Sequence, residues 1–348
     1  MQSGMPLKLR HLLPENGSFY KANLHTHSTC SDGDCTVEEI KDAYRAHGYQ
    51  IVAFTDHEVC LDHSDLTDES FLALTGYELS VVEPMESQYG SYARVCHLNF
   101  IAKEPHNRKQ VFYHPDYVWR NATAYMDQVV HDGHRLRPYD TETLNAIIRA
   151  GGEAGFLVAL NHPKWSLQTS EDYAGLEGLW GVEIINGISC REGFEENQPH
   201  VFEEMLRQGK PVFPLATDDC HDTHMFIGYV MIAAPKLEYA AVIRALEQGD
   251  FYASNGAEIH SLTLEGDTLR VTCTPCRQIR LLTERRWVLV ANADGEPLTE
   301  AAFHLRGWFD GCMPGRAAYF RVSITDEQGR CAYTRAYSRE ELKDHFLG

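Results

Sequence analysis

Apolar segments of strand length alternate with helical segments between residues 20 and 255, and this alternation constrains the fold more than any other feature. The first helical segment begins with a capping box, Thr36 to Glu39, and Gly48 is placed to end it. The apolar segments are nearly continuous, as expected for strands buried on both faces of a parallel sheet. We therefore predict an α/β fold with helices covering a parallel sheet.

Polar residues follow the apolar segments at their C-terminal ends. The segments expected as strands are YKANLHTH, QIVAFTDH, FLALTGYELS, ARVCHLNFIA, GFLVALNHP, GLWGVEIING and PVFPLATDDCH. In α/β barrels the catalytic residues lie at the C-terminal ends of the strands. This pattern favours a barrel-type enzyme with its chemistry at one end.

The character of the sequence changes after about residue 256, where apolar and polar residues alternate around a Gly-Asp pair in SLTLEGDTLRVTCT. We predict a catalytic barrel over residues 1–256 and a small antiparallel, sandwich-like β domain over residues 257–348 that ends in a short helix. Residues 101–139 are rich in Tyr, His and Asp and fit no strand–helix unit. They are predicted to be an insertion that forms a lid over the site.

The composition limits the partners of the protein. The net charge is −19, without a run of Lys or Arg, so long nucleic acids would be repelled. The ten cysteines lack the paired spacing of a four-cysteine zinc site, which indicates reduced thiols. The N-terminal residues lack a signal-peptide core, and no apolar run approaches the roughly 20 residues that span a bilayer. We expect a cytoplasmic protein that acts on a small substrate without a membrane; the sequence leaves open whether it forms a homo-oligomer.

Histidine is unusually frequent, with 18 residues, and it is the side chain that binds metals most often. His25 and His27 are two apart, so on a strand their side chains share one face, as two ligands of one metal would. Alone, the pair fits two exposed histidines on an edge strand better. Further ligand-type residues lie at or near the ends of other strands: Asp56, His57, Glu78, His97, Asn161, His162, Asp218, Asp219 and His221. Burying such groups together is costly without a counter-charge, which divalent metals supply.

The order of these motifs is H-x-H, S-D-G, T-D-H, Glu, His, His-Pro and D-x-H, and it resembles the PHP (polymerase and histidinol phosphatase) superfamily over about residues 20–255. The chain looks most like stand-alone metal-dependent phosphoesterases that carry an extra C-terminal β domain. The segments ALEQGDFYASNG and YFRVSITDEQGRCAYTRAY also resemble that group. The resemblance implies a distorted (β/α)7 TIM-like barrel with two or three metals at the C-terminal ends of its strands.

The resemblance also implies a role for each motif residue. The first metal would be held by His25, His27, Glu78 and Asp219; the second by Glu78, His97 and His162; and the third by Asp32, His57 and His221. Such mixed nitrogen and oxygen ligands suit Zn, Mn or Fe. Glu78, Asp219 and His221 are the predicted catalytic residues, with Glu78 bridging two metals.

Two motifs depart from the family pattern. Residues 161–163 read NHP where the family often has AHP, and residues 218–221 read DDCH where it often has SDAH. The ligand types survive both changes. The direction of Asp218 is left open, whereas Cys220 lies between two ligands on a strand and is expected to point to the opposite face.

These residues predict a metal-dependent phosphoesterase that hydrolyses a small phosphorylated metabolite or nucleotide, with a metal-bridging hydroxide as the nucleophile. Asp56 is expected to orient a ligand, and Lys164 either contacts the phosphate or is a solvated surface residue. One alternative is a metal-dependent hydrolase of the amidohydrolase type, although such enzymes often bridge their metals with a carbamylated lysine where this chain has Glu78. The other is a degenerate PHP module that binds without catalysis. The chain keeps all nine ligand positions, which argues against this alternative.

Overall fold

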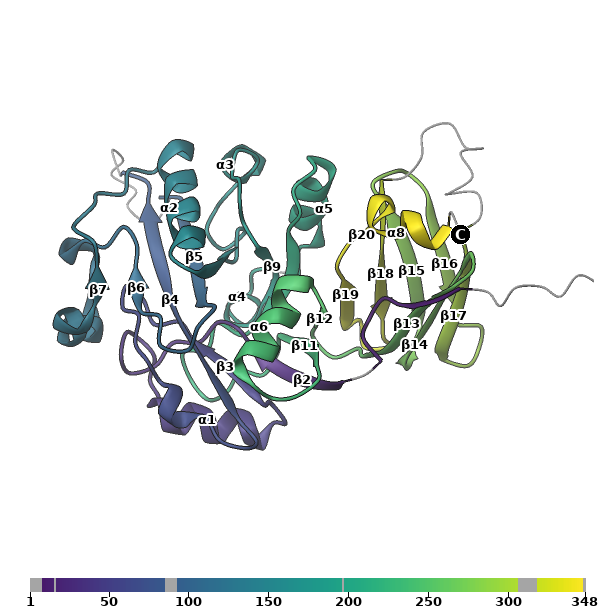
Figure 1. Ribbon diagram of the computed structural model, residues 1–348, viewed down its shortest axis with the longest axis horizontal. Helices are drawn as coiled ribbons and strands as arrows, with labels where there is room; N and C mark the ends of the chain where they lie inside the picture. The colour runs from purple at the N-terminus through teal and green to yellow at the C-terminus, as the bar shows by residue number, and fades with distance from the viewer. Residues whose placement is uncertain (1–7, 16, 85–92, 196, 306–317, 347–348) are drawn as a thin grey trace, which may run out of the picture.

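The computed structural model describes residues 8–15, 17–84, 93–195, 197–305 and 318–346. It is an elongated mixed α/β structure (Figure 1), in which most helices lie in one half and strands dominate the other. One 14-stranded sheet joins the two halves, and a four-stranded sheet and a two-stranded sheet accompany it. None of the described helices is long and apolar enough to cross a lipid bilayer.

The large sheet contains strands from both halves of the chain. Its members are β2 (Ser18–Asn23), β3 (Ile51–Phe54), β4 (Leu72–Val82), β5 (Val95–Ala102), β8 (Phe156–Leu160), β9 (Gly181–Asn186), β10 (Phe213–Thr217), β11 (Tyr229–Ala234), β12 (Phe251–Ser254), β15 (Gln278–Thr283), β16 (Val288–Asn292), β18 (Tyr319–Thr325), β19 (Cys331–Thr334) and β20 (Tyr337–Ser338). Their order is β10-β9-β8-β5-β4-β3-β2-β11-β12-β19-β18-β15-β16, and β20 pairs with β18. The four-stranded sheet has the order β1-β13-β14-β17, with β1 (Leu9–His11), β13 (Ile259–Glu265), β14 (Thr268–Cys276) and β17 (Leu298–His304). The two-stranded sheet pairs β6 (Lys109–Gln110) with β7 (Val130–His131).

The helices follow the predicted alternation in the first part of the chain. They are α1 (Val37–Ala46), α2 (Thr141–Glu153), α3 (Ser170–Tyr173), α4 (Gly187–Arg191), α5 (Pro199–Arg207), α6 (Tyr239–Gln248) and α8 (Arg339–Phe346), with 3-10 helices η1 (Ser64–Leu66), η3 (Pro115–Tyr117) and η4 (Arg120–Gln128). The capping box of α1 is confirmed: the backbone N–H of Glu39 donates to Oγ1 of Thr36 at 3.2 Å, and the N–H of Thr36 donates to the Glu39 carboxylate at 2.9 Å. Two of the orphan N–H groups at this helix start are thereby satisfied.

The prediction of an entirely parallel sheet is wrong at β5. Strands β2, β3 and β4 are parallel, as are β8, β9 and β10, but β5 runs antiparallel to both β4 and β8. A strand buried on both faces is apolar in either direction, so its hydrophobic pattern does not reveal this reversal. His97, near the start of β5, pairs with Ser80 of β4 and therefore lies at the same end of the sheet as Glu78.

The predicted closed barrel is not confirmed, because the large sheet does not close through its described strands. β10 stands at one end of the strand order, and β2 lies six positions along it. Beyond the ends of these two strands, an isolated parallel bridge joins Thr26 to Cys220. The backbone segments that carry His25, His27 and Asp219 are nevertheless brought together by this bridge.

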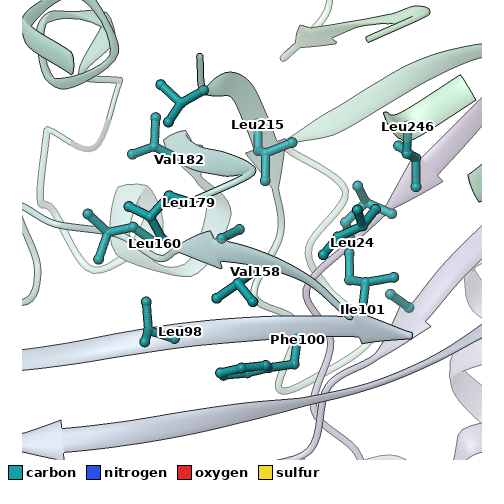
Figure 2. Packing of buried hydrophobic residues seen from close by; sticks show 14 of the residues in the cluster. Leu24, Leu98, Phe100, Ile101, Val158, Leu160, Leu179, Val182, Leu215 and Leu246 are labelled. Atoms are coloured by element: carbon teal, nitrogen blue, oxygen red, sulfur yellow. The ribbon is translucent and has the colours of Figure 1, made fainter. Parts of the chain in front are cut away.

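Buried aliphatic side chains hold the strands of the first half against their helices. Figure 2 shows this packing, with labelled side chains from β5, β8, β9 and β10 gathered together with Leu24 and with Leu246 of α6. Burial of such side chains contributes about 1.5–3 kcal/mol each. This core gives the sheet a rigid base from which the loops at its end project.

The C-terminal β region, residues 257–346 of the described chain, consists of strands followed by α8. Strands β13 and β14 form the predicted hairpin, with Glu265 paired to Thr268 across the turn. The first described strand, β1, also belongs here, because it pairs with β13 and its neighbours Leu12 and Leu13 pack into the same core. The division into domains at residue 256 stays a prediction.

Candidate metal centre

All nine residues predicted as metal ligands lie together at one end of the large sheet. Seven are buried, while Asp32 and His221 are partly buried. They form four overlapping groups in which the donor atoms lie within 4.8 Å of one another: His25, His27 and Asp219; His25, Glu78 and His162; His57, Glu78 and His97; and His27, Asp32, His57 and His221. We call these nine residues the ligand cluster; their role as ligands stays a prediction.

The tightest convergence involves His25, His27 and Asp219. The two Nε2 atoms lie 3.1 Å apart, and they lie 3.2 and 3.1 Å from Oδ1 of Asp219. Ligand atoms about 2.1 Å from a shared tetrahedral metal would lie about 3.4 Å from each other. The three atoms therefore have nearly the separations that one small divalent cation requires.

Glu78 occupies the middle of the ligand cluster. Its Oε2 lies 3.2 Å from Nε2 of His27 and 3.1 Å from Nδ1 of His57, and its Oε1 lies 3.1 Å from Nδ1 of His97. The two carboxylate oxygens thus face different histidines, as a carboxylate that bridges two metals would.

The third group forms around Asp32. Its carboxylate lies 3.4 Å from Nε2 of His221, 3.5 Å from Nδ1 of His27 and 3.9 Å from Nε2 of His57. This differs from the grouping implied by the resemblance, because His27 contributes an atom here as well as to the first group. The ligand cluster is therefore more continuous than three separate ligand sets.

Several polar atoms of the ligand cluster are buried without a hydrogen-bond partner. They are Nδ1 of His27, His57 and His97, and Oδ1 of Asp219. An unpaired buried polar atom costs about 1–3 kcal/mol, so native structures rarely leave several side by side. The donor set of imidazoles and carboxylates fits divalent metals such as Zn, Mn or Fe, which would satisfy these atoms.

Local backbone structure fixes the first two histidines. β2 ends at Asn23, earlier than predicted, but Thr26 still makes the bridge to Cys220, so His25 and His27 flank a paired residue and share a face. Asp56 accepts hydrogen bonds from the N–H and hydroxyl groups of Ser28 and from the hydroxyl of Ser31. It thus holds the turn that carries Asp32, while its role in orienting a metal ligand stays a prediction.

Two predicted ligands have strained backbones. His162 and Asp219 have φ values of 23° and 53°, in the left-handed region that residues with a Cβ rarely adopt. Such strain costs on the order of 1–3 kcal/mol and is concentrated at functional sites. Both residues belong to the ligand cluster, so these left-handed conformations lie at the predicted metal site.

The neighbours of Asp219 point away from the ligand cluster. Asp218 accepts hydrogen bonds from the hydroxyl of Tyr44 at 2.8 Å and from the N–H of Gly228 at 2.8 Å. Cys220 is buried and directs its Sγ to the carbonyl of Asp222 at 2.8 Å. The face expected for Cys220 is therefore observed, and the direction left open for Asp218 is resolved.

Glu183 of β9 contacts the ligand cluster, and the sequence analysis missed it. Its carboxylate lies 2.7 Å from Nδ1 of His25, and it accepts hydrogen bonds from the N–H of His162, the hydroxyl of Thr217 and the amide of Asn186. A proton on Nδ1 that donates to Glu183 would leave Nε2 of His25 for a metal. The signal was a glutamate inside the apolar segment GVEIIN, where a carboxylate needs a buried partner.

Two effects oppose each other on the histidines of the ligand cluster: burial lowers their pKa values, and neighbouring carboxylates raise them. Burial lowers the pKa of His57 to about 3, so this imidazole is neutral and able to bind a metal. Burial also acts to lower the pKa of His27, but Asp219 and Glu78 outweigh it and raise that pKa to about 10. Without a metal His27 therefore holds a proton, which metal binding would have to displace.

A cavity of about 1150 Å³ lies over the ligand cluster. Trp119 lies on one side, with its ring 5.4 Å from that of His57, and Trp165 lies on another, 4.9 Å from the ring of His162. Asp116, Tyr117, Arg120 and residues 136–138 of the predicted insertion line it as well. The function of this segment as a lid stays a prediction.

Lys164 lies outside the residues that line this cavity. Its ammonium group donates to the carboxylate of Glu195 at 3.1 Å, and its side chain is partly exposed. The structure therefore brings the other predicted site residues together, but not this one. The predicted contact of Lys164 with phosphate stays a prediction.

Residues 23–162 match the model of the PHP domain family. This part of the chain is a PHP domain. The matched range includes seven of the nine residues of the ligand cluster and ends at His162, so that Asp219 and His221 lie beyond it. Among curated proteins the chain has no match.

Three solved structures are similar to the chain. A two-domain protein from Bacteroides vulgatus that contains a predicted PHP-like metal-dependent phosphoesterase has a TM-score of 0.44 and 14% identity, over 97% of this chain and 100% of that one. A candidate metal-dependent phosphoesterase from Bifidobacterium adolescentis has a TM-score of 0.36 and 16% identity, over 61% and 90%. An amidohydrolase from Chromobacterium violaceum with bound sulfate and no metal has a TM-score of 0.36 and 14% identity, over 57% and 87%. At these TM-scores and identities they do not decide the reaction of the PHP domain described above.

Proposed function

We propose that this protein is a metal-dependent phosphoesterase that hydrolyses a small phosphorylated substrate. The observation that carries the proposal is the convergence of His25, His27 and Asp219 on one point, beside a central Glu78 and several unpaired ring nitrogens. The PHP domain match over residues 23–162 supports it. The nine residues of the ligand cluster are the proposed ligands of two or three divalent metals. When bound, such metals would stabilise negative charge on a phosphate and lower the pKa of water.

Other residues of the chain would orient the proposed ligands and exclude water from the site. Glu183 holds the ring of His25 through Nδ1, and Asn161 donates to Oε1 of Glu78 at 2.6 Å. Partners of this kind fix the direction of a ligand, and their loss typically costs about 10–100-fold in metal affinity or activity. Trp119 and Trp165 would limit the access of water to a bound substrate.

Hydrolysis of a C–N bond is the second candidate in the same reaction class. Enzymes of that type often bridge their metals with a carbamylated lysine, and no lysine occurs among the described residues that line the cavity. Glu78 occupies the central position instead. This favours the phosphoester over the amide.

The barrel predicted from the sequence belongs to the same proposal. We propose that the strands around the ligand cluster are a distorted seven-stranded barrel, with the bridge between Thr26 and Cys220 at its seam. The domain division at residue 256 and a cytoplasmic location are further parts of this proposal.

The test combines metal content with hydrolysis. The protein purified without chelator should contain at least two equivalents of divalent metal and hydrolyse aryl phosphates when manganese is added. Asp219→Asn should lose both properties. Asp218→Asn is the matched control, because Asn keeps the oxygen that accepts from the N–H of Gly228 while the ligand cluster is untouched. Fewer than two metals together with no phosphoester hydrolysis would refute the proposal.

A further inference from the structure

The cavity over the ligand cluster is lined mainly by acidic, apolar and aromatic side chains. Asp34, Asp116 and Glu192 add carboxylates to those of the ligand cluster, and such groups repel a phosphate. Among the described residues that line the cavity, two carry a permanent positive charge, Arg120 and Arg137. These two arginines are therefore the described lining side chains that could bind a phosphate through a permanent charge.

The guanidinium of Arg137 is already paired with Glu58. Its Nη1 and Nη2 donate to the two carboxylate oxygens of Glu58 at 2.9 and 2.7 Å, and Nη1 also donates to the carbonyl of Ser80 at 2.9 Å. Both residues of the ion pair are buried. Separating them would leave an unpaired charge in the interior, so Arg137 fixes the cavity wall and is closed to a ligand.

Arg120 is available. Its side chain is 60% exposed, and Nη1 lies 3.8 Å from Oδ2 of Asp32, too far for a hydrogen bond. The guanidinium lies 4.8 Å from the ring centre of Trp119, which itself contacts His57. Arg120 also has a left-handed backbone, with φ of 47° at the first residue of η4. The guanidinium is thus held beside the ligand cluster with its donors free.

We propose that Arg120 binds the phosphate of the substrate and selects phosphomonoesters, an inference that rests on the proposed phosphoesterase function. A monoester has three non-bridging oxygens, so one would remain for the planar guanidinium if bound metals took the other two. A diester has only two. Arg120 takes the role that the sequence suggested for Lys164, whose ammonium is paired with Glu195.

The experiment compares Arg120→Ala with Arg135→Ala in the metal-loaded protein. Arg135 is a matched control on the same segment: it lies 5.1 Å from the ring centre of Phe112 and 3.9 Å from Asp132, and it is not among the residues that line the cavity. A charge-assisted hydrogen bond corresponds to about 10–100-fold in binding. Arg120→Ala should raise KM for an aryl monoester by that factor, and Arg120→Lys should recover part of it. Arg135→Ala should change KM less than about threefold, because its charge is exposed.

The readouts separate this inference from the proposed function. Binding of inorganic phosphate to the metal-loaded protein, measured by calorimetry, should weaken about 10–100-fold in Arg120→Ala with metal content unchanged. If Arg120→Ala and Arg135→Ala bind phosphate equally well, the role of Arg120 is refuted even when the wild type is active. An equal loss of monoester and diester hydrolysis in Arg120→Ala would refute the selection of monoesters. If the wild type hydrolyses no phosphoester, the proposed function fails, while the calorimetry still decides whether Arg120 binds phosphate.

Discussion

The ligand cluster and the core of the C-terminal β region are both buried, but opposite chemistry fills them. The core, which includes Leu262, Leu264, Leu281 and Ile324, consists of apolar side chains that need only one another. The ligand cluster contains three carboxylates and six imidazoles, several with unpaired atoms. Apolar packing is stable on its own, whereas buried ionisable groups need a counter-charge. The core should therefore be indifferent to metal, and the ligand cluster should depend on it.

The substitution Glu78→Gln should produce the largest effect. Its carboxylate faces His27, His57 and His97, and an amide neither carries the charge nor offers two equivalent oxygens to them. We expect hydrolysis to fall on the order of 10³-fold, which corresponds to ~4 kcal/mol of transition-state stabilisation, with loss of bound metal. Metal analysis and kcat/KM for an aryl phosphate measure this. The control is Glu83→Gln, because Glu83 is paired with Arg94, and this variant should keep its bound metal and its hydrolysis. Equal losses in the Glu78 and Glu83 variants would contradict the bridging role of Glu78.

The substitution Leu281→Ala tests the apolar core of the C-terminal β region. Leu281 is fully buried, and truncating such a side chain costs about 2–5 kcal/mol of unfolding free energy. Urea unfolding should show this loss, whereas the metal content per folded molecule should equal that of the wild type. A parallel loss of metal would mean that the two regions are coupled through the large sheet.

Removal of metal should destabilise the wild type by about 2.7 kcal/mol relative to protein with free metal at a hundred times Kd. At one fixed concentration of free metal the effect should be larger at pH 8 than at pH 6, because protons compete with metals for histidines such as His27, whose pKa is raised to about 10. Thermal unfolding with and without chelator at both pH values measures it. In Glu78→Gln the chelator should have little effect; a full response there would place the metal elsewhere.

Glu341 gives the smallest expected effect and a defined pH dependence. Burial acts to raise its pKa, but the hydrogen bonds from Arg335, at 2.6 and 2.9 Å, outweigh it and hold the pKa below the ordinary value. Its contribution is present above pH 4.5, the ordinary value, and disappears as the pH falls through the lowered pKa. Glu341→Gln should cost about 1 kcal/mol at pH 7. In urea unfolding this difference from the wild type should vanish in strong acid; a constant difference would show that charge is not its cause.

Strand-end positions together with the resemblance to the PHP superfamily predict the nine residues of the ligand cluster, and the structure brings them together. Their role as ligands stays a prediction. His25 and His27 share a face as predicted, although β2 ends at Asn23 and an isolated bridge from Thr26 to Cys220 sets their direction. The capping box at Thr36 forms as expected. What the sequence could not predict depends on distant pairing. The direction of β5 leaves no trace in an apolar segment, and the partner of Glu183 lies 158 residues away at His25. The same holds for Glu58, whose buried partner Arg137 belongs to a segment without a recognisable pattern.

The pairing of β1 with β13 has a consequence for how the protein is made. Leu9–His11 leave the ribosome early, but their partners in Ile259–Glu265 emerge only after the whole PHP domain. Until then the apolar side chains of Leu12 and Leu13 have no core to enter. Contacts of such long sequence separation form slowly, and exposed apolar segments invite aggregation in the meantime. Pairing of β1 therefore has to wait for β13, and we expect nascent chains to depend most on chaperones until the strands that complete this core have emerged.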